Sequence, residues 1–250
     1  RQLYPFFDRI FIYDSYSCRI DKGTHKAINQ FRNFAYKVSQ NHTKTVWILK
    51  CDIKKFFASI DHSVFKNIIS NYIPDQDIKW LLWQVIDSFE TSPDKGLPLG
   101  NLTSQLLVNV YMNVFDQYMK HKLKVRYYIR YADDFAIFSD DKHYLEKMLA
   151  KIDLFLREKF KLNLHPNKVS ISTLASGVDF LGWVHFVDHR VLRSVSKRRI
   201  FVNIRLAKEK LDQELITEYS FNQTLQSYYG ILKHCQGHKL SLEIEFLVKR

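Results

Sequence analysis

Two adjacent aspartates, Asp133 and Asp134, stand between two runs of residues that are typical of β-strands. Residues 125–130 and 135–139 are rich in aromatic and β-branched side chains, so the sequence predicts a hairpin with both carboxylates at its tip. Carboxylates this close repel each other unless a cation lies between them. The tip is therefore a candidate metal site, although Asp-Asp pairs also occur in turns for conformational reasons alone.

A third aspartate, Asp52, ends another strand-like run at residues 46–53. Carboxylates on neighbouring strands can hold two Mg²⁺ ions about 4 Å apart, which is the arrangement used for in-line phosphoryl transfer. We therefore expect Asp52, Asp133 and Asp134 to meet in space at a catalytic metal centre.

The overall charge favours a nucleic-acid partner. The chain has 250 residues, a formal net charge of +12 and 15% aromatic residues. A cationic surface binds polyanions by counterion release, and aromatic side chains stack on bases. The alternative is a basic surface that only maintains solubility.

Cysteine usage and hydropathy bound the compartment. Cys18, Cys51 and Cys235 are far apart, which argues against a disulfide framework or a zinc site and predicts a cytoplasmic protein. No apolar run reaches membrane-spanning length and no signal peptide is visible, so we expect no membrane partner. The first residue is Arg1 rather than methionine, and we expect an upstream segment to be missing.

Hydrophobic periodicity predicts an irregular mixture of helices and strands, hence an α+β fold. A shift to a basic helical pattern near residue 190 divides the chain into 1–190 and 191–250. The expected helices include 24–39, 102–123, 142–161, 196–214 and 221–235, and the expected strands include 45–52, 168–173 and 178–187.

Five segments follow one another in the order found in reverse transcriptases, and together they resemble that family. They are 52–57 (Asp-Ile-Lys-Lys-Phe-Phe), 97–105 (Leu-Pro-Leu-Gly-Asn-Leu-Thr-Ser-Gln), 131–134 (Tyr-Ala-Asp-Asp), 162–168 (Leu-Asn-Leu-His-Pro-Asn-Lys) and 177–183 (Gly-Val-Asp-Phe-Leu-Gly-Trp). The resemblance implies a right-hand polymerase fold with partial fingers and a palm built on an antiparallel sheet in 1–190, and a helical thumb in 191–250. It also implies an RNA-directed DNA polymerase that uses template RNA, a DNA or RNA primer and dNTPs.

The segment at 97–105 resembles one subfamily in particular. Leu99 and Gln105 stand where most reverse transcriptases have glutamine and proline, and this departure resembles the enzymes of diversity-generating retroelements. Residues 18–25 and 228–234 resemble the same group. The resemblance implies error-prone copying opposite adenine and a small basic accessory protein.

The same resemblance assigns roles to individual residues. Two Mg²⁺ ions, with Mn²⁺ as a substitute, would be held by the aspartates and by the backbone carbonyl of Ile53. Lys168 would protonate the leaving pyrophosphate or neutralise its charge; the alternative is that Lys168 lies at a solvated strand end. Phe57 would exclude the ribose 2′-hydroxyl; the alternative is that Phe57 is an ordinary core residue. Gly100 would let the backbone approach substrate, while Leu99 and Gln105 would lie near the nucleotide and templating base.

Further residues would contact the substrates. No basic fingers hairpin is identifiable in the sequence, so Arg19 is expected to assist triphosphate binding and activity of the chain alone is in question. Leu181, Gly182 and Trp183 would form the primer grip. A basic helix would hold the duplex backbone, although a solvated helix face is an equally common interpretation; its residues are Lys197, Arg198, Arg199, Arg205 and Lys208.

Two rival functions stay open from the sequence. One is a reverse transcriptase of another bacterial kind, either group II intron-like or active in antiphage defence. The other is a catalytically silent RNA-binding protein on a polymerase scaffold, for which the intact aspartate set is the counter-argument.

Overall fold

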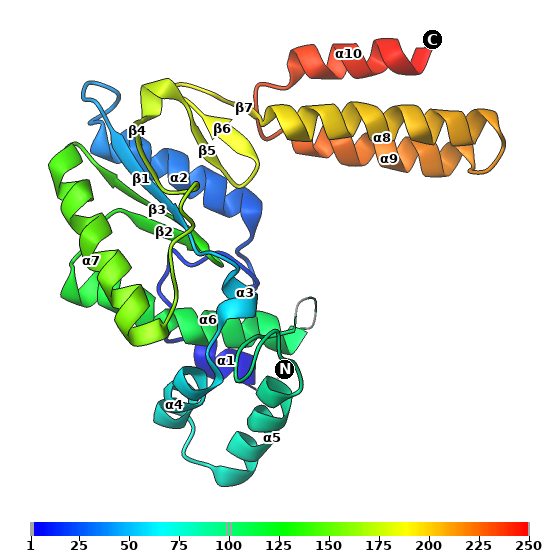
Figure 1. The fold of residues 1–250 in the computed structure, drawn as a ribbon. Helices are drawn as coiled ribbons and strands as arrows, with labels where there is room; N and C mark the ends of the chain where they lie inside the picture. Colours follow the sequence, from blue (N-terminus) through cyan, green and yellow to red (C-terminus); the bar gives the residue numbers. More distant parts are fainter. Residues whose placement is uncertain (1–2, 99, 101, 250) are drawn as a thin grey trace. The chain divides into compact units, whose positions relative to one another are not determined.

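The computed structural model describes residues 3–98, 100 and 102–249. The chain divides into two compact units, residues 1–173 and 174–250 (Figure 1). The first unit ends at residue 173 and the second begins at residue 174, whereas the sequence predicts a division near residue 190, which stays a prediction. The naming of the parts as fingers, palm and thumb stays a prediction.

The first unit is built on a four-stranded antiparallel sheet. Its strands are β1 (Trp47–Asp52), β2 (Tyr128–Tyr131), β3 (Asp134–Ser139) and β4 (Ser170–Thr173), in the spatial order β2-β3-β1-β4. The two central strands, β1 and β3, pair along their whole length. The predicted α+β class is confirmed.

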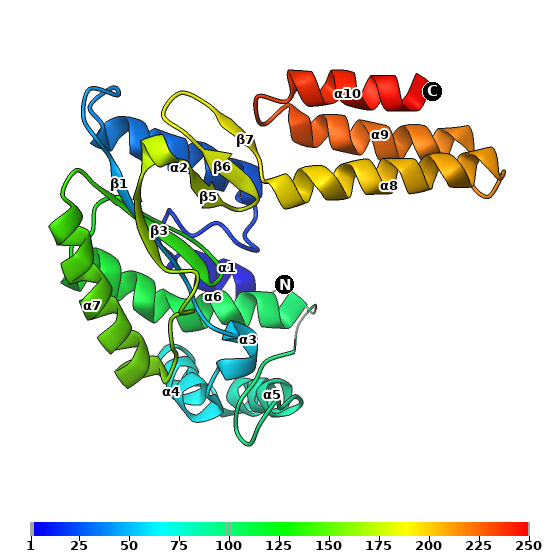
Figure 2. The ribbon, with the colours of Figure 1, turned by 45° about the horizontal axis from the view of Figure 1, so that its top comes forward.

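Helices cover both faces of this sheet (Figures 1 and 2). On one face, Phe31 and Phe34 of α2 (Thr24–Val38) contact the ring of Phe138 edge-on. On the other, Phe115 of α6 (Leu102–Gln117) contacts Phe135, and α7 (Lys142–Phe160) packs on β1, β3 and β4. Neighbouring strand residues point to opposite faces, so a strand covered on both sides is apolar throughout. The apolar sequence of β3 therefore follows from its central place.

Short helices complete the first unit. They are α1 (Leu3–Asp8), α3 (Phe56–Ser59), α4 (His62–Tyr72), α5 (Gln76–Asp87) and the π-helical turn η1 (Tyr118–Lys122) that continues α6. Aspartates cap two of them, α4 and α5, as well as the longer α7. Asp61, Asp75 and Asp141 each accept a hydrogen bond from an amide in the first turn of the following helix. Such a bond satisfies one of the otherwise unpaired amides at a helix start.

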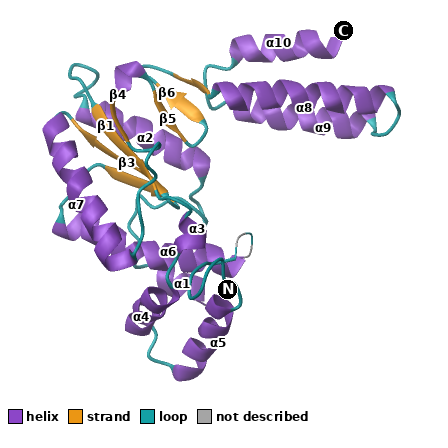
Figure 3. Ribbon diagram, viewed as in Figure 1, coloured by secondary structure: helices purple, strands orange, loops and turns teal. Residues whose placement is uncertain are grey.

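The second unit combines a small meander with three helices (Figure 3). A 3₁₀ turn, η2 (Leu174–Ser176), precedes β5 (Val178–Phe180), β6 (Trp183–His185) and β7 (Arg190–Leu192), which pair in sequence order. The helices α8 (Ser194–Asp212), α9 (Glu218–Leu232) and α10 (His238–Lys249) pack against one another. Neither α1 nor α10 was predicted from the sequence, and the strand-like stretch expected at 178–187 contains β5 and β6.

No helix in the described part of the chain combines the length and the apolar character needed to cross a membrane.

Candidate active site

The strand register brings two of the predicted aspartates side by side. Asp52, the last residue of β1, is the direct cross-strand partner of Asp134, the first residue of β3. Tyr131 also pairs with Asp134, so Ala132 and Asp133 form a two-residue hairpin turn beside them. All three carboxylate residues therefore lie at one end of the central strands, as the sequence predicted for the hairpin.

The turn has an unusual backbone. Ala132 has a φ of 55°, a region that favours glycine, whereas Asp133 is not among the residues with positive φ. Two-residue hairpins with a positive φ at the first turn residue match the right-handed twist of the flanking strands. The conformation places Asp133 at the tip at the expense of strain at Ala132.

Burial and mutual repulsion disfavour the negative charges. Burial raises the pKa of Asp134 to about 7; the carboxylates of Asp52 and Asp133 act in the same direction, and Lys50, 3.5 Å away, opposes them. Burial also raises the pKa of Asp133, with a smaller contribution from Asp52. Asp134 Oδ1 is buried and has no hydrogen-bond partner among the described residues.

This donor set fits divalent cations. Hard oxygen ligands that are desolvated, mutually repulsive and in part unpartnered are stabilised by a bound cation. Ile53 follows Asp52 and forms an isolated bridge with Leu164, in which Lys54 N–H donates to the Asn163 carbonyl, so this bridge leaves the Ile53 carbonyl unused.

Lys168 is the cation nearest to Asp52. Its ammonium lies 3.2 Å from Oδ1 and 3.1 Å from Oδ2 of Asp52. The Lys168 side chain is 54% exposed, against 15% for Asp52. An exposed amine on a flexible stem can leave the carboxylate when another cation or a phosphate arrives.

One compact group of potential metal ligands occurs among the described residues, and it is a different one. A ring nitrogen of His62 and carboxylate oxygens of Glu90 and Asp94 lie within 4.8 Å of one another. His62 Nε2 lies 2.7 Å from the Gly96 carbonyl oxygen, so the imidazole has a partner within the chain and we assign no metal there. The predicted aspartates do not form such a group in this conformation, so side chains must rotate before one ion contacts all three.

Two of the residues predicted to bind the nucleotide lie on helices, Phe57 on α3 and Gln105 on α6. Phe57 is half-buried, whereas its neighbour Phe56 is buried in the core. Gly100 has a φ of 91°, and a side chain there would meet no atom within 4 Å. Gln105 is half-buried in α6. Leu99 lies outside the described residues. The roles predicted for these four residues stay predictions.

The Arg19 side chain makes contacts within the N-terminal segment, and its predicted contact with the nucleotide stays a prediction. Its side chain is 7% exposed, and Nε lies 2.6 Å from Asp8 Oδ1. Nη1 donates to the carbonyls of Ile12 at 2.7 Å and Ser15 at 3.0 Å. The sequence showed a basic residue near the expected substrate site but not the acceptors that fold back onto it.

The predicted primer-grip residues form the tight turn between β5 and β6. Phe180 pairs with Trp183, and Leu181 and Gly182 between them have φ values of 52° and 90°. Positive φ at both turn residues is typical of the type I′ hairpin. Trp183 is buried, whereas Leu181 and Gly182 are half-exposed at the tip.

The five basic residues predicted to grip the duplex divide into two groups on α8. Lys197 pairs with Glu243 of α10 at 3.2 Å, and Lys208 donates to the Val248 carbonyl at 3.0 Å, so both amines connect α8 to α10. The other three side chains are exposed; they belong to Arg198, Arg199 and Arg205.

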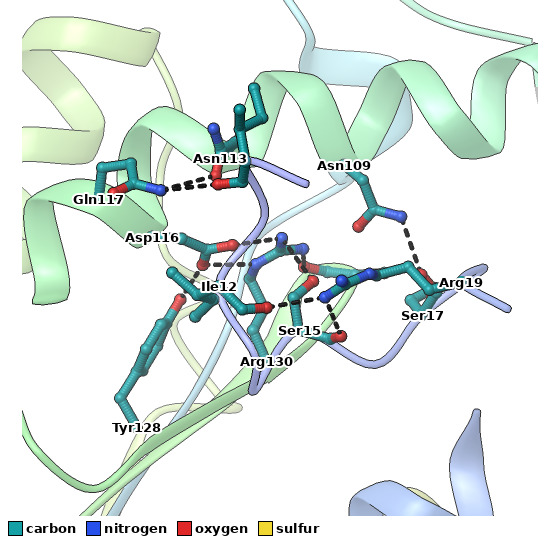
Figure 4. A network of polar contacts seen from close by, with 12 residues as sticks. Ile12, Ser15, Ser17, Arg19, Asn109, Asn113, Asp116, Gln117, Tyr128 and Arg130 are labelled. Atoms are coloured by element: carbon teal, nitrogen blue, oxygen red, sulfur yellow. Dashed lines mark hydrogen bonds and ion pairs between the residues drawn. The ribbon is translucent and has the colours of Figure 1, made fainter. Parts of the chain in front are cut away.

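A buried polar network beside the hairpin was not predicted (Figure 4). Arg130 and Asp116 form an ion pair with no exposed side-chain surface, and Tyr128 donates to the same carboxylate at 2.7 Å. Arg130 directly precedes Tyr131, and a charged residue inside an apolar strand was the available signal, because such a residue requires a buried partner.

Solved structures of telomerase share this fold. A Candida tropicalis telomerase lacking its C-terminal domain aligns with a TM-score of 0.56 and 12% identity over 72% of this chain and 41% of its own. The Candida albicans telomerase with the TWJ fragment of telomeric RNA aligns with a TM-score of 0.55 and 12% identity over 93% and 48%. The fold is therefore that of the right-hand polymerases.

Within that class, the chain belongs to the reverse transcriptase family. The family described as "Reverse transcriptase (RNA-dependent DNA polymerase)" matches residues 1–185. Protein YkfC of Escherichia coli K12 is 25% identical over 231 residues, covering 77% of this chain and 58% of YkfC. The retron Ec73 reverse transcriptase of E. coli is 25% identical over 213 residues, covering 78% and 64%. The group II intron-encoded protein LtrA of Lactococcus lactis is 23% identical over 226 residues, covering 61% and 36%. This chain thus spans less than two thirds of each relative.

Proposed function

We propose that this chain carries the catalytic part of an RNA-directed DNA polymerase that extends a DNA or RNA primer with dNTPs. The observation that carries the proposal is the cross-strand pairing of Asp52 with Asp134, with Asp133 at the adjoining turn, in a member of the reverse transcriptase family. The burial that disfavours these charges without a cation supports Mg²⁺, with Mn²⁺ as a substitute.

The residues suggest a division of labour in the reaction. Divalent ions would be held by Asp52 and Asp133, with Asp134 and the Ile53 carbonyl assisting. These ions would lower the pKa of the primer 3′-hydroxyl and stabilise the leaving pyrophosphate. Lys168 supplies a proton or a positive charge to that leaving group once it releases Asp52.

The remaining predicted residues would bind and select the substrates. Phe57 presents a half-buried ring against which a ribose 2′-hydroxyl clashes. Leu181 and Gly182, with Trp183 beneath them, hold the primer end, and the exposed arginines of α8 hold the duplex backbone. The three cysteines are unpaired thiols, which suits the cytoplasmic setting that we propose.

Primer extension tests the activity. Poly(A) RNA annealed to oligo(dT) is incubated with dTTP and Mg²⁺ and the wild-type or Asp133→Asn protein. We expect extension by the wild type alone. A wild-type protein that binds the duplex but does not extend it would instead support the silent RNA-binding function.

The subfamily is a finer proposal. Leu99 stands in place of the usual glutamine and so lacks its polar contact to the incoming nucleotide, and Gln105 stands in place of the usual proline and so lacks its rigid ring under the template base. These two differences support the error-prone polymerase of a diversity-generating retroelement that works with a small basic accessory protein. The similarity to the retron and group II intron proteins favours the second candidate, a reverse transcriptase of one of those kinds.

Sequencing of cDNA separates the two candidates. The wild type and the Leu99→Gln/Gln105→Pro variant copy one mixed-base RNA under the same conditions. The retroelement assignment predicts excess misincorporation opposite adenine that the variant reduces. Equal wild-type error rates opposite all four bases would exclude it.

A further inference from the structure

The guanidinium of Arg130 connects three parts of the first unit. Nε donates to Asp116 Oδ1 at 2.8 Å and Nη2 to Oδ2 at 2.6 Å, which anchors Arg130 to α6. Nη2 also donates to the Ser15 hydroxyl at 3.0 Å, and Nη1 donates to the Ala132 carbonyl at 3.0 Å. Figure 4 shows the guanidinium between Asp116 and Ser15. The same group therefore reaches α6, the N-terminal segment and the turn that carries Asp133.

The backbone makes a parallel connection. Ser15 and Arg130 form an isolated parallel bridge, in which Arg130 N–H donates to the Asp14 carbonyl at 3.0 Å and Tyr16 N–H donates to the Arg130 carbonyl at 2.9 Å. β2 is the edge strand of its sheet, so this segment pairs with an edge that β3 does not cover. Arg19 holds the segment by donating to the Ser15 carbonyl.

The hydrogen bond to the turn falls at its strained residue. Ala132 has a φ of 55°, which an alanine adopts at a cost that glycine avoids. A strained conformation persists only when surrounding contacts over-determine it. The bond from Nη1 to the Ala132 carbonyl is such a contact, and the guanidinium cannot shift without breaking its bonds to Asp116 and Ser15.

We propose that Arg130 is a positioning residue that holds the Ala132–Asp133 turn in its strained conformation, and that Ser15 and Asp116 hold Arg130. We call Ser15, Asp116 and Arg130 the turn brace. The proposal rests on the proposed function, because the turn presents Asp133 to the metal ions. If Arg130 acts in this way, the segment that carries Ser15 helps to set the catalytic geometry, although it lies more than a hundred residues before the turn in sequence.

Conservative variants test the brace. Arg130→Lys keeps the charge but cannot make the fork of bonds that the guanidinium makes. Its matched control is Arg126→Lys, since Arg126 is exposed just before β2. Ser15→Ala removes one acceptor of the brace. Its control is Ser17→Ala, since the buried Ser17 hydroxyl bonds to Cys18 Sγ rather than to Arg130.

Two readouts do not depend on primer extension. Hydrogen exchange of peptides that cover residues 128–139 reports opening of the turn. Titration with Mn²⁺, followed by electron paramagnetic resonance, reports the affinity of the metal site, and the Asp133→Asn protein gives the baseline for this titration. We expect Arg130→Lys to raise exchange and weaken Mn²⁺ binding by about tenfold or more, with a cooperative melting transition retained. Ser15→Ala should shift both in the same direction by a few-fold, while both controls match the wild type.

A rescue experiment separates positioning from general stabilisation. Ala132→Gly lets the turn adopt its φ without strain, so it should restore most of the Mn²⁺ affinity and the slow exchange to Arg130→Lys. A purely structural ion pair would not be rescued by a substitution in the turn. Losses that Ala132→Gly leaves unchanged would overturn the proposal, as would a folded Arg130→Lys protein indistinguishable from wild type.

The outcomes also separate this proposal from the proposed function. If Arg130→Lys does not melt cooperatively, Ser15→Ala against Ser17→Ala decides, and identical behaviour of that pair overturns the brace. If the wild type binds Mn²⁺ but extends no primer, the polymerase proposal fails, while the exchange and titration results still decide on the brace.

Discussion

Arg130 and Asp116 are paired with both side chains fully withdrawn from solvent, and their closest atoms, Nη2 and Oδ2, lie 2.6 Å apart. Burial disfavours the charged form of Arg130, and Asp116 more than offsets this, so the pKa of Arg130 is raised. Each charge is thus tolerated only because the other is present.

Removing one partner should therefore be costly. We expect Asp116→Ala to lower the free energy of unfolding by about 3–5 kcal/mol, because it leaves a buried guanidinium uncompensated. The control is Asp153→Ala, whose pair with Arg157 at 2.8 Å is solvent-exposed and should contribute at most about 1 kcal/mol. Urea unfolding measures both, and equal effects would show that the Arg130–Asp116 pair is not structurally important.

The fold was predictable where periodicity and apolar runs carry the information. The helix expected at 142–161 is α7, and the hairpin around Asp133 has its strands where aromatic and β-branched residues predicted them. These elements are decided by local pattern and by burial of one stripe or run.

The parts that were missed depend on long-range partners. The Arg19 side chain holds the N-terminal segment together, because it donates hydrogen bonds to Asp8 and to the Ile12 carbonyl. Arg130 gained its role from Ser15, which is more than a hundred positions away in sequence. No local pattern specifies such pairings, so a charged residue in an apolar strand indicates only that a partner exists.

Asp133→Asn should abolish primer extension and leave the fold intact. The substitution keeps the shape of the side chain and removes a ligand charge, so we expect the rate to fall by at least about a thousandfold. The melting temperature in the absence of metal should stay near that of the wild type or rise, because burial disfavours the charge that is removed. Extension within tenfold of wild type would show that the metal assignment is wrong.

Stability and metal binding should depend on pH through Asp134. Its pKa is raised from 3.8 to about 7 in the folded protein. Between these values the folded state binds more protons than the unfolded state, so the metal-free protein loses this contribution to stability as the pH rises through about 7.

Mg²⁺ should reverse that loss, because it binds the deprotonated carboxylates and competes with the proton. We expect Mg²⁺ to raise the melting temperature more at about pH 8 than at about pH 6, with proton competition weakening its binding by roughly 1.4 kcal/mol per pH unit below the pKa. Thermal melts with Mg²⁺ and with a chelator measure the shift. The Asp133→Asn protein should show little rise in melting temperature with Mg²⁺. A rise that is independent of pH in the wild type would contradict the assignment of the aspartates as metal ligands.

Sugar selection should depend on Phe57 and not on Phe56. Phe57→Val removes the half-buried ring, so the ratio of kcat/KM for dNTP over rNTP should fall by at least about tenfold, equivalent to about 1.4 kcal/mol of discrimination. Phe56→Val should instead lower stability by about 1–3 kcal/mol and keep the ratio, because Phe56 is 2% exposed in the core. Steady-state kinetics with both substrates and a urea melt distinguish the two residues. An unchanged ratio in Phe57→Val would move the gate elsewhere.

The two groups of basic residues on α8 should respond differently to substitution. Arg198, Arg199 and Arg205 are exposed, so we expect them to contact duplex phosphates. Replacing all three by alanine should weaken binding to an RNA–DNA duplex whatever its sequence. The slope of log K against log salt should also decrease by roughly one for each arginine that had neutralised a phosphate.

Lys197 and Lys208 supply the matched control, because their amines are engaged by Glu243 and by the Val248 carbonyl of α10. Lys197→Ala/Lys208→Ala removes two charges from the same helix, so a general effect of net charge would lower affinity in both variants. If the contacts to α10 are what these lysines provide, the double variant should lower the melting temperature and keep most of the salt slope. Fluorescence anisotropy at several salt concentrations, together with thermal melts, measures both quantities. Equal slopes in the triple variant and the wild type would place the three arginines on a solvated face, and a slope that fell only in the lysine variant would exchange the roles of the two groups.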